Sequence, residues 1–209
     1  NSVIYGGFLL CAGHFTLAFQ NELFFFTGLI LIILGVGLLK PNISTLVGNL
    51  YKINDLRRDQ GFTIFYIGIN VGAFLASIIV GYVGEVFGWH YGFSLAGFGM
   101  LLGQISFLIG KKNIIEVSKK TSAKSTFSFK MKKHKLSSIE LDRVKLILIS
   151  SLILVIFWAS FEQAGGLLNI FAYEKTNRYI SLLNFEIPAS WFQSINPLLI
   201  IVLGYSVSV

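Results

Sequence analysis

The sequence predicts an all-α integral membrane protein. Hydrophobic residues make up 54% of its 209 residues and charged residues only 13%, whereas soluble domains carry about 25% charged residues. The mean hydropathy is +0.72. The apolar residues form six long runs, and a helix needs about 20 such residues to cross a bilayer. Strands of a membrane β-barrel would be about 10 residues long and would alternate in polarity. These runs are longer and do not alternate.

The six expected spans follow one another along the whole chain. The second and the fifth are the longest, which predicts helices that tilt or extend beyond the bilayer. The expected spans are Ser2–Phe19, Leu23–Leu50, Phe62–Val83, Tyr91–Ile109, Val144–Tyr173 and Ala189–Val209.

The charges of the connecting loops predict the orientation in the membrane. The connection 51–61 holds three basic residues, and the stretch from Lys111 to Lys145 holds eleven basic residues against three acidic ones. Acidic residues outnumber basic ones in the other three connections. Because loops rich in Lys and Arg stay in the cytoplasm, we expect 51–61 and 111–143 to be cytoplasmic. This topology also accounts for the net charge of +7, so no nucleic-acid partner is expected.

The basic stretch 111–143 divides the chain into two parts. Its low apolar content and repeated like charge favour a solvated, partly disordered linker. Four expected spans (1–110) precede it and two (144–209) follow it. At its end, Ser137 or Ser138 is expected to cap the helix of the fifth span, with Glu140 in the first turn.

Lys40 lies inside the second apolar run, with seventeen uncharged residues before it and another ten that separate it from Tyr51. A lysine near a helix end can reach the membrane surface with its long side chain. Because the apolar run continues past this residue, we instead expect Lys40 to be buried and to face the interior of the protein. Pro41 removes a backbone donor and is expected to bend the helix there.

The third span contains Tyr66 and Asn70, which lie on one helix face because they are four residues apart. Phe62 lies one turn earlier on this face. The amide of Asn70 suits either a hydrogen bond between helices or a binding site, and the residues alone leave both open. Gly68 and Gly72 are expected to pack against a neighbouring helix.

The fifth span contains Glu162, with sixteen uncharged residues before it and eleven after it. An acid at membrane depth suggests a protonatable group that faces a cavity. Trp158 lies one turn earlier on the same face, and the helix is expected to loosen at the glycines that follow, 165–166. In the sixth span, Asn196 is a second amide at membrane depth.

Together these side chains suit the binding of a zwitterion, and the acid is also able to take a proton. The sequence contains no GxSxG, HExxH or P-loop motif, so it predicts neither an enzyme nor an ATP-driven transporter. Its single cysteine, Cys11, excludes an intrachain disulfide and a metal site built on cysteines.

Five stretches, in chain order, resemble successive motifs of the proton-dependent oligopeptide transporter (POT/PTR) family. They are "GLLKPNISTLVGNLY", "RRDQGFTIFYIGINVGAF", "GWHYGFSLAGFGM", "FWASFEQAGGLLNIFA" and "WFQSINPLLII". The string "FYxxINxG" is a signature of that family. The resemblance implies a major facilitator-type helical bundle of twelve helices in two halves. By motif order, the six spans correspond to helices three to eight.

The resemblance also implies roles for single residues. Lys40 matches a lysine that helps to hold the carboxyl end of a bound peptide. Tyr66 and Asn70 match positions that contact the peptide, and Asn196 resembles an asparagine near its amino end. Glu162 matches a protonation site that pairs with an arginine of helix one.

The resemblance further implies that Trp158 lines the cavity. The implied function is proton-coupled symport of di- and tripeptides across the cytoplasmic membrane by alternating access. The proton gradient drives it, and no cofactor or metal is expected. The implied partners are the peptide, protons and the lipid bilayer.

The chain departs from the family pattern in what it lacks. The "ExxER" motif of helix one and the acid of helix ten are absent, and 111–145 is too short and too polar for the two extra helices of many bacterial relatives. We therefore expect these six spans to need the other helices of a full-length transporter and not to transport alone. Two alternatives remain: a major facilitator transporter of another small substrate, such as an amino acid or nitrate, and a non-transporting remnant.

Overall fold

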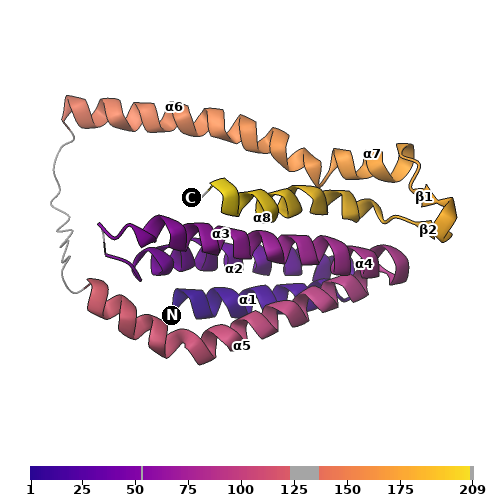
Figure 1. The fold of residues 1–209 in the computed structure, drawn as a ribbon, viewed down its shortest axis with the longest axis horizontal. Helices are drawn as coiled ribbons and strands as arrows, with labels where there is room; N and C mark the ends of the chain where they lie inside the picture. The colour runs from indigo at the N-terminus through magenta and orange to yellow at the C-terminus, as the bar shows by residue number, and fades with distance from the viewer. Residues whose placement is uncertain (53, 123–136, 208–209) are drawn as a thin grey trace. The chain divides into compact units, whose positions relative to one another are not determined.

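The computed structural model describes residues 1–52, 54–122 and 137–207, which are mainly helical (Figure 1). The chain forms two compact units by its internal contacts, Asn1–Ser125 with Ser190–Val209, and Thr126–Ala189. The helices are α1 (Ser2–Leu17), α2 (Glu22–Gly48), α3 (Arg57–Leu75), α4 (Gly81–Phe87), α5 (Trp89–Ser122), α6 (Ser138–Phe161), α7 (Leu167–Lys175) and α8 (Ile195–Val207).

All six expected spans contain apolar helices. Within the described residues, four are long and apolar enough to cross a membrane, namely Glu22–Gly48, Arg57–Phe87, Trp89–Ser118 and Ser138–Lys175. The first and sixth are shorter. The sixth begins as a 3₁₀ helix, Ala189–Ser194, and its α-helix starts only at Ile195. Pro197 falls in the first turn of α8, where its missing N–H is not needed.

In the first unit, α1 packs against both α2 and α5. Glycines bring α1 and α2 close together, since a Cβ atom on Gly35 would lie 2.8 Å from Cγ of Leu10 and 2.9 Å from the carbonyl oxygen of Gly6. Small residues allow such close approach between membrane helices. On the α5 side, the side chain of Gln104 donates a hydrogen bond to the carbonyl oxygen of Ile4 at 2.9 Å.

The third span is one long apolar helix whose middle is widened. A π-helical turn, Ala76–Val80, joins α3 to α4. At the start, Asp55 accepts hydrogen bonds from the backbone N–H of Arg57 at 3.0 Å and from its guanidinium at 2.9 Å and 3.1 Å. These bonds favour the ionised carboxylate, so the pKa of Asp55 lies below its usual range.

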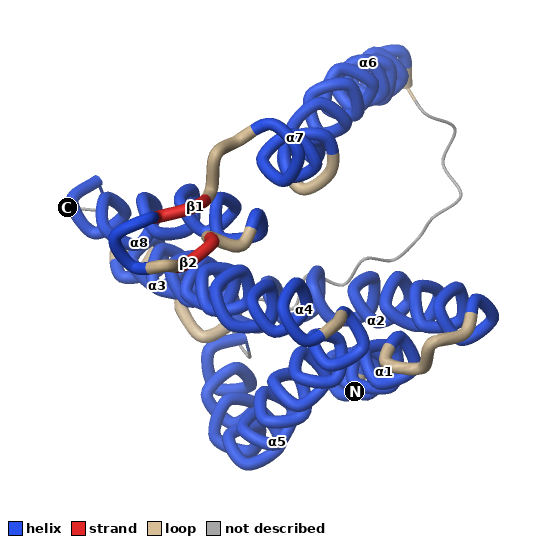
Figure 2. The backbone as a smooth tube through the Cα atoms, turned by 90° about the vertical axis from the view of Figure 1, so that its right-hand side faces the viewer, coloured by secondary structure: helices blue, strands red, loops and turns tan. Residues whose placement is uncertain are grey.

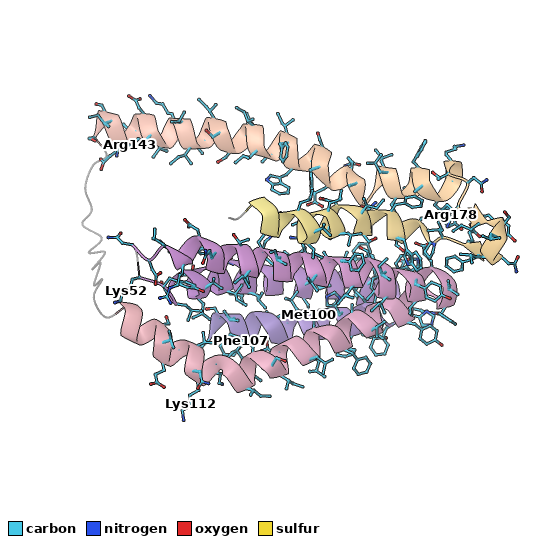
Figure 3. The ribbon with its side chains drawn as sticks, viewed as in Figure 1. Lys52, Met100, Phe107, Lys112, Arg143 and Arg178 are labelled. Atoms are coloured by element: carbon cyan, nitrogen blue, oxygen red, sulfur yellow. The ribbon has the colours of Figure 1, made fainter. Side chains whose placement is uncertain are left out.

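Helix α5 extends beyond the expected end of its span at Ile109 and continues to Ser122. Helix α5 thus reaches into the stretch 111–143, whose assignment as a linker stays a prediction. Lys111 and Ile115 of the extension line a pocket with residues of α1 and α2, and Lys112 is exposed. Figure 3 shows Lys52 and Lys112 at the same end of this unit. The rest of the linker, 123–136, lies outside the described residues.

In the second unit, α6 begins as predicted. Ser137 caps it: its hydroxyl accepts the N–H of Glu140 at 3.3 Å, and the Glu140 carboxylate accepts the N–H of Ser137 at 2.7 Å. This reciprocal pair is a capping box. After α7, two short antiparallel strands, β1 (Tyr179–Ile180) and β2 (Phe185–Glu186), form a hairpin (Figure 2).

Candidate functional site

Lys40 lies in α2 directly before Pro41, and α2 continues past this proline to Gly48. Lys40 is exposed, so the described residues do not provide its expected burial. The reason is that α1 covers a different face of α2, the one that carries Gly28 and Gly35. Within the described residues, no acidic group lies within ion-pair distance of Lys40. The ammonium group is therefore available to a carboxylate from outside this unit.

Tyr66 and Asn70 lie one turn apart on α3, as predicted. Asn70 is buried with 8% exposure, and its side-chain N–H donates to the carbonyl oxygen of Tyr66 at 2.8 Å. Among the described residues, the amide N–H thus bonds within its own helix and not across to another one. Tyr66 is exposed and lies on the same side as Phe62, since both line one groove.

This groove runs between α3 and α8 and has a volume of about 570 Å³. Its walls are almost wholly apolar, which suits aliphatic or aromatic groups more than charged ones. The lining residues are Phe62, Thr63, Tyr66 and Ile67 of α3 and Leu199, Ile200, Leu203 and Gly204 of α8.

The predicted packing of Gly68 and Gly72 is not found within the described residues. Nothing lies within 4 Å of a Cβ atom placed on either glycine. The groove and Tyr66 lie on a different face of α3 from these two glycines. Asn196, the predicted amide of α8, is exposed near the start of that helix and is not among the groove residues.

Glu162 lies where α6 ends, in the second unit. The predicted loosening is confirmed: α6 stops at Phe161, a 3₁₀ turn spans Glu162–Ala164, and Gly166 adopts φ −99° and ψ −97° before α7. Glu162 is exposed. The carboxylate thus lies at the break between α6 and α7.

Trp158 lies one turn before Glu162 and is 51% exposed. Its ring meets that of Phe161 edge to face at 5.4 Å. Phe157 contacts both rings, at 5.6 Å and 6.2 Å. The tryptophan is thus part of an aromatic cluster at the end of α6, next to the acid.

The sequence did not single out two polar clusters that the structure shows. In the hairpin of the second unit, the guanidinium of Arg178 pairs with Glu186 at 2.7 Å and donates to the carbonyl oxygen of Ile187 at 2.6 Å. It also lies 4.8 Å from the ring centre of Tyr173. In the first unit, Glu85 contacts the segment before α8. Both acids look like ordinary loop charges in the sequence, and no local pattern indicates their partners.

Comparisons with known proteins give a consistent result over the whole chain. The family model PTR2, described as the POT family, matches residues 1–132 and 115–205. The peptide transporter YePEPT of Yersinia enterocolitica is 32% identical over 97% of this chain and 51% of its own length. A di-/tripeptide transporter of Lactococcus lactis subsp. cremoris is 30% identical over 97% of this chain and 52% of its own length. The chain thus spans about half the length of the curated relatives it matches.

Solved structures agree with the sequence relatives. The crystal structure of a peptide transporter POT in complex with sulfate has a TM-score of 0.71 and 29% identity, over 99% of this chain and 52% of its own. A POT family transporter in complex with 5-aminolevulinic acid has a TM-score of 0.69 and 26% identity, over 99% of this chain and 54% of its own. These neighbours have the major facilitator-type helical fold, as the sequence predicted. The chain belongs to the POT family, which consists of membrane transporters and not of enzymes.

Proposed function

We propose that this chain forms part of a proton-coupled symporter that carries di- and tripeptides across the cytoplasmic membrane by alternating access. The single observation that carries the proposal is the family match, which extends over nearly the whole chain. Relatives that are about one-third identical are named as peptide or di-/tripeptide transporters. The loops 51–61 and 111–143 are proposed to lie in the cytoplasm, because both are strongly basic.

The proposed peptide site combines a cation with an apolar groove. Lys40 would bind the carboxylate end of the peptide, and its lack of an acidic partner in the described residues supports this role. Tyr66 and Asn70 would contact the peptide, with Tyr66 at the wall of the groove between α3 and α8. Asn196 would lie near the amino end, and Trp158 would line the cavity.

Glu162 is the proposed proton-coupling residue. Protonation removes its charge, and in a low-dielectric site this changes its interaction with any nearby cation by several kilocalories per mole. The break between α6 and α7 gives the backbone there a way to respond. Two halves of the full-length fold would then rock around a site near the middle of the bilayer.

The test is uptake of labelled alanylalanine by the full-length transporter in proteoliposomes. Replacing Glu162 by glutamine keeps the shape of the side chain but removes its titration. We expect uptake driven by an inward proton gradient to fall at least about tenfold, while exchange of internal for external peptide continues, because only the coupled step is lost. Gradient-driven uptake that survives in Glu162→Gln would contradict the coupling role.

A second substrate class has one supporting observation. A POT family transporter has been solved with 5-aminolevulinic acid, which is a single small zwitterion and not a peptide. The two possibilities differ in competition assays. If 5-aminolevulinic acid or an amino acid inhibits uptake at lower concentration than any dipeptide does, the peptide assignment is wrong.

A further inference from the structure

The start of α8 is held against α4 and the preceding π-helical turn by a compact set of contacts. The backbone N–H of Ser190 donates to the carboxylate of Glu85 at 2.7 Å. The indole N–H of Trp191 donates to the carbonyl oxygen of Ile78 at 3.0 Å. The side chain of Ser190 sits against Gly81, where a Cβ atom would lie 2.3 Å from the serine oxygen. We call these five residues the α4–α8 junction.

Close packing and directed hydrogen bonds distinguish the α4–α8 junction from a chance contact. With glycine at position 81 the side chain of Ser190 packs directly against the helix, and a Cβ atom there would make the two segments shift apart. Trp191 enters from another segment and bonds a carbonyl of the π-helical turn, whose widened backbone departs from regular α-helical bonding. Its ring also lies beside Tyr82, with ring centres 6.3 Å apart. Single π-helical turns are frequent at functional sites in helices.

The position of the junction follows from the course of the two helices. α3 begins beside the basic loop 51–61, which we propose is cytoplasmic, and α4 lies at its far end. α8 runs in the opposite direction, since Ser190 contacts Gly81 whereas Gly204 contacts Ile67 (Figure 1). The junction is therefore at the extracytoplasmic end of the helix pair.

We propose that the α4–α8 junction holds the extracytoplasmic ends of the two halves of the transporter together and must separate whenever the substrate site opens to the outside. This rests on the proposed alternating-access function, in which α1–α5 and α8 belong to different halves. A junction made mostly of hydrogen bonds to backbone groups, with Glu85 as the charged partner, can part and re-form without exposing a large apolar surface. Glu85 is in this sense a positioning residue, not a substrate ligand.

A cross-link tests the need for separation. In the full-length transporter with Cys11→Ser, the pair Gly81→Cys and Ser190→Cys should form a disulfide on oxidation. An ideal Cβ on Gly81 lies 2.6 Å from Cβ of Ser190, so a small outward shift of the two segments brings them to the roughly 3.8 Å of a disulfide. We expect the oxidised pair to lose alanylalanine uptake and dithiothreitol to restore it. Each single-cysteine variant is the control, and its uptake should be the same before and after treatment with the oxidant. Full cross-linking with unchanged uptake would overturn the proposal.

A second measurement does not depend on whether the double-cysteine variant folds. The hydroxyl oxygen of Ser190 is buried and has no hydrogen-bond partner among the described atoms, so Ser190→Cys should be tolerated and should report opening. We expect a membrane-impermeant maleimide to label it slowly. Adding Glu85→Ala should raise that rate about tenfold, which is the population shift expected when a hydrogen bond to a charged group is lost. Adding Trp191→Phe, which keeps a ring but removes the donor, should raise it less.

Asn21→Cys is the matched control for labelling, because Asn21 is exposed in a connection expected on the same side. Its rate should be high and should not respond to Glu85→Ala. If Ser190→Cys is labelled as fast as Asn21→Cys, or if Glu85→Ala leaves its rate unchanged, the junction does not control opening. Labelling needs no transport, so it still tests the junction if the full-length protein takes up no dipeptide and the proposed function itself fails.

Discussion

Lys40 presents a full positive charge with no acidic partner in the described part of the chain. If it binds the peptide carboxylate, Lys40→Gln should weaken binding of alanylalanine by about 1.5–3 kcal/mol, the usual value of a hydrogen bond to a charged group. The same substitution should hardly change the binding of alanylalanine amide, which has no carboxylate. Competition against labelled dipeptide uptake measures both affinities.

Lys40→Arg is the control, because it keeps the charge and should keep part of the preference for the free carboxylate. The site assignment would be wrong if Lys40→Gln weakened the peptide and its amide equally, since that result would indicate a general loss of folding or of transport.

Arg178 gives a second prediction for single residues. Its side chain is 8% exposed, whereas that of Glu186 is 61% exposed. Arg178→Ala should therefore destabilise the hairpin by about 2 kcal/mol, through loss of the bond to Ile187 and of the contact with Tyr173. Glu186→Ala should cost less, about 1 kcal/mol, because the guanidinium keeps its bond to Ile187 and its contact with Tyr173. Thermal unfolding of the full-length protein measures both, and equal losses would contradict this ranking.

At the scale of residues, short-range pairings were legible in the sequence and long-range ones were not. Ser137 and Glu140 form the predicted capping arrangement because both partners lie within one turn. Tyr66 and Asn70 likewise share a helix turn. The partners of Arg178 and Glu85 depend on how a hairpin folds and where α8 docks. Those contacts become visible only when the segments have been placed.

At the scale of elements, Gly35 and Gly37 of α2 allow a matched comparison between a packed and an unpacked glycine. A Cβ atom on Gly35 would crowd Leu10 and the backbone of Gly6, whereas one on Gly37 meets nothing within 4 Å. Gly35→Ala should therefore destabilise the α1–α2 pair by about 1–3 kcal/mol. Gly37→Ala should be neutral or gain up to about 1 kcal/mol from helix propensity.

The reactivity of Cys11 can report this difference, because its side chain is buried in α1. The temperature at which a thiol-reactive dye labels Cys11 should fall for Gly35→Ala and stay or rise for Gly37→Ala. The packing argument would be wrong if both substitutions shifted that temperature in the same direction by the same amount.

The boundaries of elements were harder to predict than their existence. Apolar runs located all six helical regions, but α5 continues past the expected end of its span to Ser122, because lysine and glutamate favour a helix although they end the apolar run. The six residues before Ile195 belong to the expected sixth span, yet they include two serines and a glutamine and form a 3₁₀ helix. The π-helical turn between α3 and α4 had no signal at all in the sequence.

At the scale of the whole molecule, family motifs carried more information than composition did. Composition and run length predict a helical membrane protein, but only the ordered motifs imply the major facilitator fold that the solved neighbours have. The division at the linker into 1–110 and 144–209 stays a prediction. The compact units follow a different boundary, because the start of α8 docks on α4 and α8 packs on α3.

The orientation of the whole chain in the membrane is the last prediction. Basic loops stay on the cytoplasmic side because moving Lys and Arg across the bilayer is unfavourable. In the full-length protein with Cys11→Ser, cysteines at Lys52 and Lys112, which lie at one end of the first unit, should react with an impermeant maleimide only after the cells are permeabilised. Cysteines at Asn21 and Asn184, in the acidic connections, should react in intact cells. Labelling of Lys52→Cys in intact cells would show that the chain has the opposite orientation. The α4–α8 junction would then lie on the cytoplasmic side.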